Sequence, residues 1–541
     1  MHRNAVKSTL STDFLWVLLW LGVLLSALIS RPPFPIDETR YLSVAWEMWH
    51  NQQFLVPHIN GIPYSHKPPL LFWLIHAGWA LFGVNAWSAR LTAPFFGLFS
   101  ILLTVRLAKV LWPDQPKWHR NIPYLMLGTC FWALYATLTM FDMLIGFFAL
   151  LAWLGLWKGK EGKQLLCWLS YGGATALGLL AKGPIILLYI LPPALLAPWW
   201  MEEKDNFSWF RWYGGLLGAT GVGIILALAW AIPAAQAGGK EYGQAILFGQ
   251  TAGRIVHSFA HQRPWYWYIF LLPALLFPWS FFPPAWSSIR KRQLTPPDKF
   301  CLSIILPGFI LLSMISGKQV HYLLPLAHPV LLLLNNEDAR GNTSAFPFRF
   351  LLPTMLFFFA LALFILPFLS LKGNDGQMLQ FLPPWLGLGP LMIAIILLRT
   401  NRTSGQSVSR ISSLLVALLI FFQLALSPQL NIRYGATDIV KELHRAQNDK
   451  REIAVCPAKL ADQFQFAGRL ARSVAPLKNL EEAVSWSMQH PKGLVLLFSN
   501  REIASFFAQQ NALTPRPYKN KWLVIVPADS LTNSYIRWTQ R

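Results

Sequence analysis

Charged residues are scarce in this sequence of 541 residues. Asp, Glu, Lys and Arg together make up 13% of the chain, whereas hydrophobic residues make up 54%. A soluble globular domain carries about 25% charged residues, which keep its surface in contact with water. The apolar residues also gather into runs about as long as the hydrocarbon core of a bilayer is thick. These features exclude a purely water-soluble protein and predict a polytopic integral membrane protein.

Cysteine is also rare, and the sequence lacks the signatures of several protein classes. The four cysteines have no metal-ligand spacing and three fall in apolar runs, so we interpret them as packing residues. The formal charge of +22 is compatible with nucleic-acid binding, but Lys and Arg lie mostly in short loops between apolar runs. Cytoplasmic loops of membrane proteins carry such an excess. No basic-aromatic motif accompanies it, so we expect no nucleic-acid partner.

The order of apolar runs and basic loops predicts the topology. Arg3 and Lys7 precede a first apolar run at 14–29, which no small-residue cleavage site follows, so the run reads as a spanning helix with its N-terminus inside. The run 68–83 begins with Pro-Pro and is short, which favours an interfacial helix. The basic clusters then fall in cytoplasmic loops. This parity predicts about 13 transmembrane helices in a membrane domain over 1–427, with outer loops at 31–87 and 234–264. Runs 165–181 and 184–200 count as two of the spans.

The composition changes near residue 427. Three short apolar runs, 451–457, 493–499 and 522–528, are typical of strands, and polar stretches at 480–490 and 502–510 are typical of helices. Their alternation predicts a small soluble α/β domain over 428–541, on the outer, periplasmic side of an otherwise all-α membrane bundle. This segment carries no nucleotide-binding glycine signature, so the sequence assigns it no chemistry.

A limited set of ionisable residues falls on the outer side with this parity. The first outer loop supplies the acids Asp37 and Glu38, and Asp142 stands alone between two apolar runs. The other members are Arg40, Tyr64, His66, Lys67, Lys182, Arg254, His257, His261, Arg263, Lys318, His321 and Tyr322. Separately, Asp142 has the features of a helix N-cap and Lys182 those of a lysine that snorkels to the interface. Together, ionisable groups near membrane depth usually face a cavity or a partner. They suit transfer chemistry on an anionic, lipid-linked substrate, in which cations bind a phosphate and an acid orients or deprotonates a nucleophile.

Four segments carry a resemblance to a known family. DETRYLSVAWEM, the Lys67-Pro68 pair, FDMLIGFF and AKGP, in this order and spacing, resemble the dolichyl-phosphate-mannose protein mannosyltransferase superfamily, whose fold is of the GT-C type. Within it the chain is most similar to the bacterial branch that includes the aminoarabinose transferases of lipid A. The likeness runs through roughly residues 12–335, and HSFAHQRPWYWYIFLLPALLFPW and SGKQVHYLLP belong to it. Beyond that point only the general layout matches.

The resemblance implies an activity and roles for matching residues. Such enzymes pass a sugar from a polyprenyl-phosphate donor to an acceptor at the outer face of the bacterial inner membrane, with inversion. Asp37 matches the first acid of the family's Asp-Glu pair and would orient or activate the acceptor, and Asp142 matches the second-loop acid. Lys67 resembles the lysine that contacts the donor phosphate. Further substrate-binding candidates are Glu38, Arg40, Tyr64, Lys182, Arg254, Lys318 and Tyr322.

One position departs from the family pattern and leaves the metal question open. His66 stands where aminoarabinose transferases typically have a glutamate. No cofactor is therefore predicted, and a divalent metal bound by His66 and His257 stays an alternative to ordinary hydrogen bonds. The expected partners are a polyprenyl-phosphate sugar, a lipid or glycan acceptor, and membrane lipids. A lipid-linked sugar transporter, a noncatalytic assembly factor and transfer to protein hydroxyls remain alternatives; a transporter predicts paired internal repeats, and none is seen.

Overall fold

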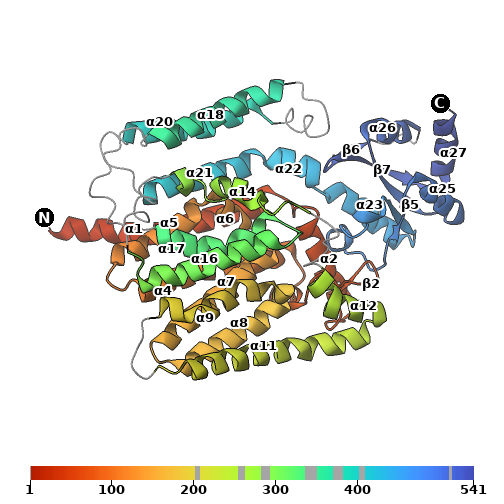
Figure 1. The fold of residues 1–541 in the computed structure, drawn as a ribbon. Coiled ribbons are helices and arrows are strands. Elements are labelled where there is room, and N and C mark those ends of the chain that lie inside the picture. The colour runs from red at the N-terminus through yellow and green to blue at the C-terminus, as the bar shows by residue number, and fades with distance from the viewer. Residues whose placement is uncertain are drawn as a thin grey trace.

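The computed structural model describes residues 2–201, 207–253, 262–281, 293–334, 350–369, 382–400, 408–510 and 514–540, with backbone alone for 2–13 and 250–253. Figure 1 shows a bundle of helices with a group of strands and short helices at one end. The N-terminus lies at the opposite end of the bundle from the C-terminus.

Long apolar helices form the bundle. In the described part of the chain, seven helical segments are long and apolar enough to cross a membrane: Ala86–Leu111 (α4), Phe141–Lys160 (α7), Gln164–Leu195 (α8, η1 and α9), Trp209–Ala237 (α11), Pro296–Met314 (α16), Leu351–Phe368 (α18 and η7) and Val408–Ala425 (α21). Four shorter apolar helices join them: Phe14–Ser30 of α1 (His2–Ser30), Leu70–Phe82 (α3), Val320–Leu334 (η4 and α17) and Pro384–Thr400 (η8 and α20). The chain is thus a multi-pass membrane protein, and the predicted fold class is confirmed.

The segment Gln164–Leu195 turns back on itself. It consists of α8 (Gln164–Lys182), the 3-10 turn η1 (Gly183–Ile186) and α9 (Leu187–Leu195), followed by α10 (Ala197–Trp200). Trp168, near the start of α8, and Trp200, beyond the end of α9, both contact Trp212 of α11, with ring centroids 5.0 and 6.3 Å apart. Both far ends therefore lie together, and the chain reverses at Gly183, whose φ of +76° favours glycine. The two predicted runs are two antiparallel legs, and Lys182 lies at the turn between them.

The segments that connect the bundle helices include shorter elements. These are α2 (Asp37–His50), β1 (His58–Ile59), β2 (Ile62–Pro63), α5 (Pro116–Gly128), α6 (Cys130–Tyr135), α12 (Lys240–Gln244), the π-helix η2 (Ala245–Gly253), α14 (Trp267–Leu275) and η3 (Trp279–Phe281). The helix α3 that follows β2 has 13 residues. At 1.5 Å per residue it measures about 20 Å, less than the roughly 30 Å of a hydrocarbon core. The interfacial position expected for residues 68–83 stays a prediction.

The C-terminal part of the chain is a five-stranded mixed sheet with helices on both faces. Its elements are α22 (Ser427–Tyr434), α23 (Thr437–Asn448), β3 (Ile453–Cys456), η9 (Ala458–Leu460), α24 (Gln465–Gly468), β4 (Ala475–Pro476), α25 (Leu480–Gln489), β5 (Leu494–Ser499), α26 (Arg501–Gln510), β6 (Arg516–Tyr518), β7 (Lys521–Pro527) and α27 (Ala528–Thr539). The strand order is β4-β3-β5-β7-β6; β4, β3 and β5 are parallel, whereas β7 is antiparallel to β5 and β6.

Alternate residues of the central strand β5 face two separate cores. Leu494 and Leu496 pack with Leu443 of α23 on one face, whereas Val495 packs with Phe507 of α26 on the other. Burial on both faces explains why this strand is a continuous apolar run rather than an alternating one. The three predicted strands and two predicted helices coincide with β3, β5, β7, α25 and α26. The exact boundary at residue 427 stays a prediction.

Candidate active site

A buried ion pair joins the ends of two bundle helices. Asp142 lies in the first turn of α7 and Lys182 is the last residue of α8, so the α7–α8 hairpin brings them together at one end of the bundle. The Lys182 Nζ lies 2.6 Å from Asp142 Oδ1, and the two side chains are 6% and 5% exposed. The carboxylate also suits the positive end of the α7 dipole. Asp142 is therefore part of a charged pair rather than a simple N-cap.

Three further polar groups surround this pair. His321 Nε2 lies 3.9 Å from the second Asp142 oxygen, and Lys182 Nζ lies 4.5 Å from the centre of the Tyr322 ring. Lys67 Nζ lies 5.8 Å from the centre of the Phe141 ring, and its charge acts on Asp142. Two segments that are far apart in sequence, one with Lys67 and one with His321 and Tyr322, thus converge on the α7–α8 hairpin. His321 belongs to the set of ionisable residues expected on the outer side, but the sequence names no separate role for it, although it adjoins Tyr322 in the same motif.

Asp37 begins helix α2 and faces the same region. It is half-buried and accepts a hydrogen bond from the Tyr41 hydroxyl at 3.4 Å. Tyr41 in turn packs edge-on against Phe141, with ring centroids 4.9 Å apart. Burial raises the pKa of the Tyr41 hydroxyl, and the charges of Asp37 and Asp142 raise it further. Both predicted acids therefore act on one phenol, which places them at the same end of the bundle.

Glu38, next to Asp37, points into the protein instead. It forms an ion pair of 2.6 Å with Arg31, and both side chains are 2% exposed. Its oxygens also accept backbone N–H groups of Phe34 at 2.9 Å and Thr139 at 2.8 Å. Burial alone would raise the pKa of Glu38, but Arg31, Arg90 and these N–H groups hold it below its ordinary value. Glu38 fixes the start of α2 to the segment before α7, and its predicted contact with substrate has no support in this geometry.

Arg40 and Lys318 also contact protein groups. Arg40 Nε lies 2.6 Å from Asp462 Oδ2 of the C-terminal region, with side chains 27% and 22% exposed. Lys318 is buried, and its Nζ donates to the backbone carbonyl oxygens of Arg263, at 3.0 Å, and Ile315. Arg40 therefore links α2 to the C-terminal region, and Lys318 joins the segment at Arg263 to the end of α16. Neither position was expected from the sequence.

The remaining predicted residues are placed less directly. Tyr64 is buried; its ring contacts Phe72 edge-on and His66 at a tilt, with ring centroids 6.3 and 5.3 Å apart, whereas His66 itself is exposed. Arg254 and His257 lie outside the described residues. Among the residues that the structure describes, no three His, Cys, Asp or Glu side chains group closely enough to hold a metal ion.

Comparisons with known proteins match part of the chain by sequence and nearly all of it by fold. The family model described as dolichyl-phosphate-mannose-protein mannosyltransferase matches residues 66–230, a stretch that contains Lys67, Asp142 and Lys182. The computed structure superimposes on the crystal structure of ArnT from Cupriavidus metallidurans in the apo state with a TM-score of 0.75, covering 98% of this chain and 99% of that chain. The chain is therefore similar to this mannosyltransferase family over residues 66–230, and it shares the fold of ArnT over nearly its whole length.

The sequence relatives cover part of the chain. An undecaprenyl phosphate-alpha-4-amino-4-deoxy-L-arabinose arabinosyl transferase of Pseudomonas fluorescens is 29% identical over 58% of this chain, and a Pseudomonas aeruginosa transferase of the same name is 28% identical over 56%. These matches span 58% and 54% of the relatives' own lengths. The structural identity is 15%, so that likeness concerns the fold alone. A second ArnT structure from C. metallidurans, bound to undecaprenyl phosphate, aligns with a TM-score of 0.73, 16% identity, and coverage of 97% and 99% of the two chains.

Two pockets lie where the segment 32–62 meets the C-terminal region. One, of about 750 Å³, is lined by Glu47 and His50 of α2 and by residues of the C-terminal region. The other, of about 450 Å³, is lined by Pro32 and Leu42 of the outer loop and by Tyr518 among others. Neither contains the Asp142–Lys182 pair. The polar groups around that pair, rather than these hollows, define the candidate active site.

Proposed function

We propose that this protein is a glycosyltransferase that moves a sugar from a polyprenyl phosphate donor, such as undecaprenyl phosphate, to a cell-envelope acceptor such as lipid A. The observation that carries the proposal is the buried Asp142–Lys182 pair, with Lys67 and Asp37 at the same end of the bundle. Burying charged groups near membrane depth is costly, and such groups are usually found where they serve a functional site. The names of the relatives and the undecaprenyl phosphate of the C. metallidurans structure support the same donor.

The cations suit a departing phosphate. In the transfer, an acceptor oxygen forms a bond to the anomeric carbon while the bond from that carbon to the donor phosphate oxygen breaks. The electron pair leaves with the polyprenyl phosphate, whose negative charge grows during this step. Lys67 and Lys182, held by their surroundings in a poorly hydrated site, stabilise this charge more in the transition state than in the ground state. Attack opposite the leaving phosphate inverts the anomeric centre.

The two acids take different parts in this proposal. Asp142 neutralises and orients Lys182 at 2.6 Å, so it sets the direction of the phosphate contact. Asp37 is half-buried, and its hydrogen bond from Tyr41 is long, at 3.4 Å. Its carboxylate can therefore also contact the acceptor and orient it. A hydroxyl acceptor passes its proton to Asp37. A phosphate acceptor already carries a nucleophilic oxygen and needs only to be positioned.

The proposed location is the bacterial inner membrane, with the site and the C-terminal region facing the periplasm. The basic residues Lys158 and Lys160 lie at the end of α7 away from Asp142. Positive loops mark the cytoplasmic side. Because Asp142 begins the same helix, the opposite end, with the active site, faces outward.

Mass spectrometry of envelope lipids tests this proposal. A strain that lacks the protein is expected to lose one defined glycan and to accumulate the corresponding polyprenyl-phosphate sugar. Wild-type protein restores the glycan, whereas Asp37→Asn and Asp142→Asn, at equal membrane abundance, do not. Full restoration by both variants, or a donor pool that does not change on deletion, contradicts the proposal.

A further inference from the structure

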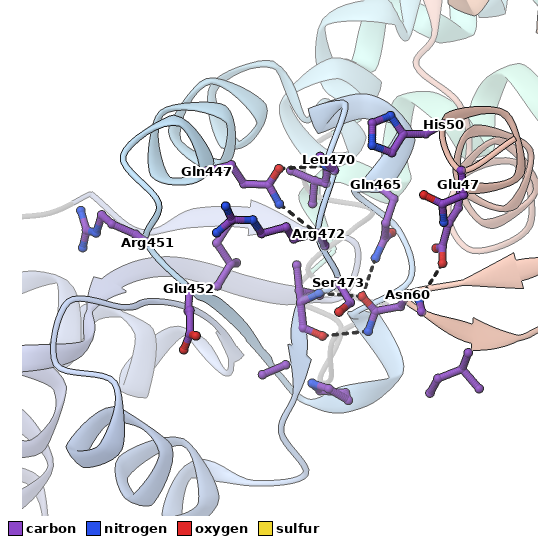
Figure 2. Close-up of a pocket in the computed structure, with 18 of the residues that line it drawn as sticks. Glu47, His50, Asn60, Gln447, Arg451, Glu452, Gln465, Leu470, Arg472 and Ser473 are labelled. Atoms are coloured by element: carbon purple, nitrogen blue, oxygen red, sulfur yellow. Dashed lines mark hydrogen bonds between the residues drawn. The ribbon is translucent and has the colours of Figure 1, made fainter.

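The pocket of about 750 Å³ at the end of α2, which we call the α2 pocket, is lined by polar side chains that are held in place by hydrogen bonds. Its volume falls within the 300–1,000 Å³ that is typical of small-ligand sites. Figure 2 shows Glu47 and His50 of α2 on one side and Gln447, Arg451 and Arg472 toward the other. Two parts of the chain that are about 400 residues apart therefore form one pocket.

Amide side chains give this pocket its shape. Asn60 accepts the Val474 N–H at 2.7 Å and donates to the Val474 carbonyl at 2.8 Å, and Gln465 donates to Asn60 at 3.2 Å. Gln447 accepts the Ala471 N–H at 2.9 Å. Gln465 is 2% exposed, and its side-chain oxygen Oε1 has no hydrogen-bond partner among the described residues. These bonds fix the wall before any ligand binds, which lowers the entropy cost of binding.

The charges that line the pocket balance, which bears on the ligand. Glu47 and Glu452 offset Arg451 and Arg472, and Arg451 already donates to the carbonyls of Lys492 and Gly493. A polyanion would meet two carboxylates and gain at most one uncommitted guanidinium. A neutral ligand rich in hydroxyl groups instead finds acceptors in the carboxylates, donors in Arg472, and the flat ring of Trp486 in the wall.

The pocket has a direct connection to the candidate active site. Glu47 is ten residues after Asp37 on the same helix, a distance of about 15 Å along the axis. That helix is bonded to the C-terminal region at three points: Arg40 to Asp462, Ser43 to the Phe466 N–H at 3.4 Å, and Trp46 to the Leu470 carbonyl at 2.9 Å. A ligand in the α2 pocket therefore binds at a fixed distance from the proposed acceptor base.

We propose that the α2 pocket binds an uncharged saccharide unit of the acceptor, remote from the atom that receives the sugar. The inference rests on the proposed transferase function, and it gives the C-terminal region a part in choosing the acceptor. Contacts so far from the reacting bond hold ground state and transition state alike. They therefore lower KM for the acceptor and leave kcat unchanged.

Two variants and a matched control test this inference. Arg472→Ala removes an exposed guanidinium, and Glu47→Gln removes a charge while it can still accept the Gly61 N–H. Arg501→Ala, at an exposed arginine of α26 outside the pocket, is the control. With the purified full chain, each pocket variant is expected to raise KM about tenfold for a glycolipid acceptor, the effect of one lost charged hydrogen bond. KM for the donor, kcat, and KM for an acceptor cut back to the sugar that receives the transfer stay unchanged.

A binding measurement keeps this test separate from the test of the transferase. In saturation-transfer NMR, the neutral N-acetylglucosamine disaccharide is expected to receive signal from the wild type and from Arg501→Ala, and to lose most of it with Arg472→Ala and Glu47→Gln. Absence of transfer with retained disaccharide binding overturns the proposed function alone. Equal KM changes for the full and cut-back acceptors, or equal disaccharide signals in all four proteins, overturn the saccharide pocket.

Discussion

Removal of one member of the Asp142–Lys182 pair should lower the stability of the protein more than removal of both. Lys182→Met leaves a carboxylate that is 5% exposed, whose other near partner, His321, lies at 3.9 Å. Breaking a buried pair in this way costs about 3–5 kcal/mol, whereas replacing both members by neutral groups is often close to neutral. We therefore expect Lys182→Met and Asp142→Asn to be destabilised, and the double variant to recover most of the loss.

The assay is a double-mutant cycle with two readouts. Thermal unfolding in detergent, followed by tryptophan fluorescence, should show the single variants melting roughly 5–10 °C lower. The double variant should melt within a few degrees of the wild type; with single losses of about 3–5 kcal/mol each, this corresponds to a coupling energy of about 6–10 kcal/mol. Transfer activity should behave differently: it should fall about 10²-fold or more in all three, because the charges themselves are missing.

Either of two results would refute this reasoning. Additive losses of melting temperature would mean that the two charges do not share one buried pair. Recovery of activity together with stability in the double variant would mean that the pair serves folding alone.

Three further predictions concern contacts that hold the site together. The pKa of Glu38 is lowered in the folded protein, so its contribution to stability is complete above the ordinary carboxyl pKa of about 4.3 and is lost as the pH falls through the folded-state pKa. Glu38→Gln should thus melt well below the wild type at pH 7, and the difference between the two melting temperatures should narrow below about pH 4. Asp462→Asn breaks a partly exposed ion pair with Arg40 and should change the free energy of unfolding by less than about 1 kcal/mol in denaturation experiments. A loss of activity as large as that of an active-site variant would contradict this minor role of the pair. Lys318→Met leaves two backbone carbonyls without their donor and should cost about 1–3 kcal/mol of stability while KM for the donor stays unchanged; a raised KM at normal stability would restore its role as a phosphate ligand.

Much of the architecture follows from composition and periodicity. Long apolar runs define membrane helices because a bilayer leaves few alternatives. The Gly183 turn after Lys182 divides 164–195 into two legs, as the sequence predicts. The apolar runs of β3, β5 and β7 have the length and branching of buried strands. These signals are local, so they can be read without the fold.

The contacts of the site are harder to predict from the sequence, because they join residues that are far apart along the chain. Asp142 and Lys182 could be assigned to the same side of the membrane, but the sequence does not reveal that they touch. Asp37 and Glu38 are adjacent, yet successive residues of a helix point about 100° apart, so one faces the site and the other Arg31. Arg40 forms an ion pair with Asp462, which lies 422 positions later in the chain. No pattern within the outer loop encodes that contact.

The most direct test of the account is the position of the donor phosphate in a cryo-EM structure of the full chain with undecaprenyl phosphate. We predict that the phosphate lies beside Lys67 and Lys182, at the end of the bundle that holds Asp37 and Asp142. A phosphate at the opposite end, near Lys158 and Lys160, would contradict the account.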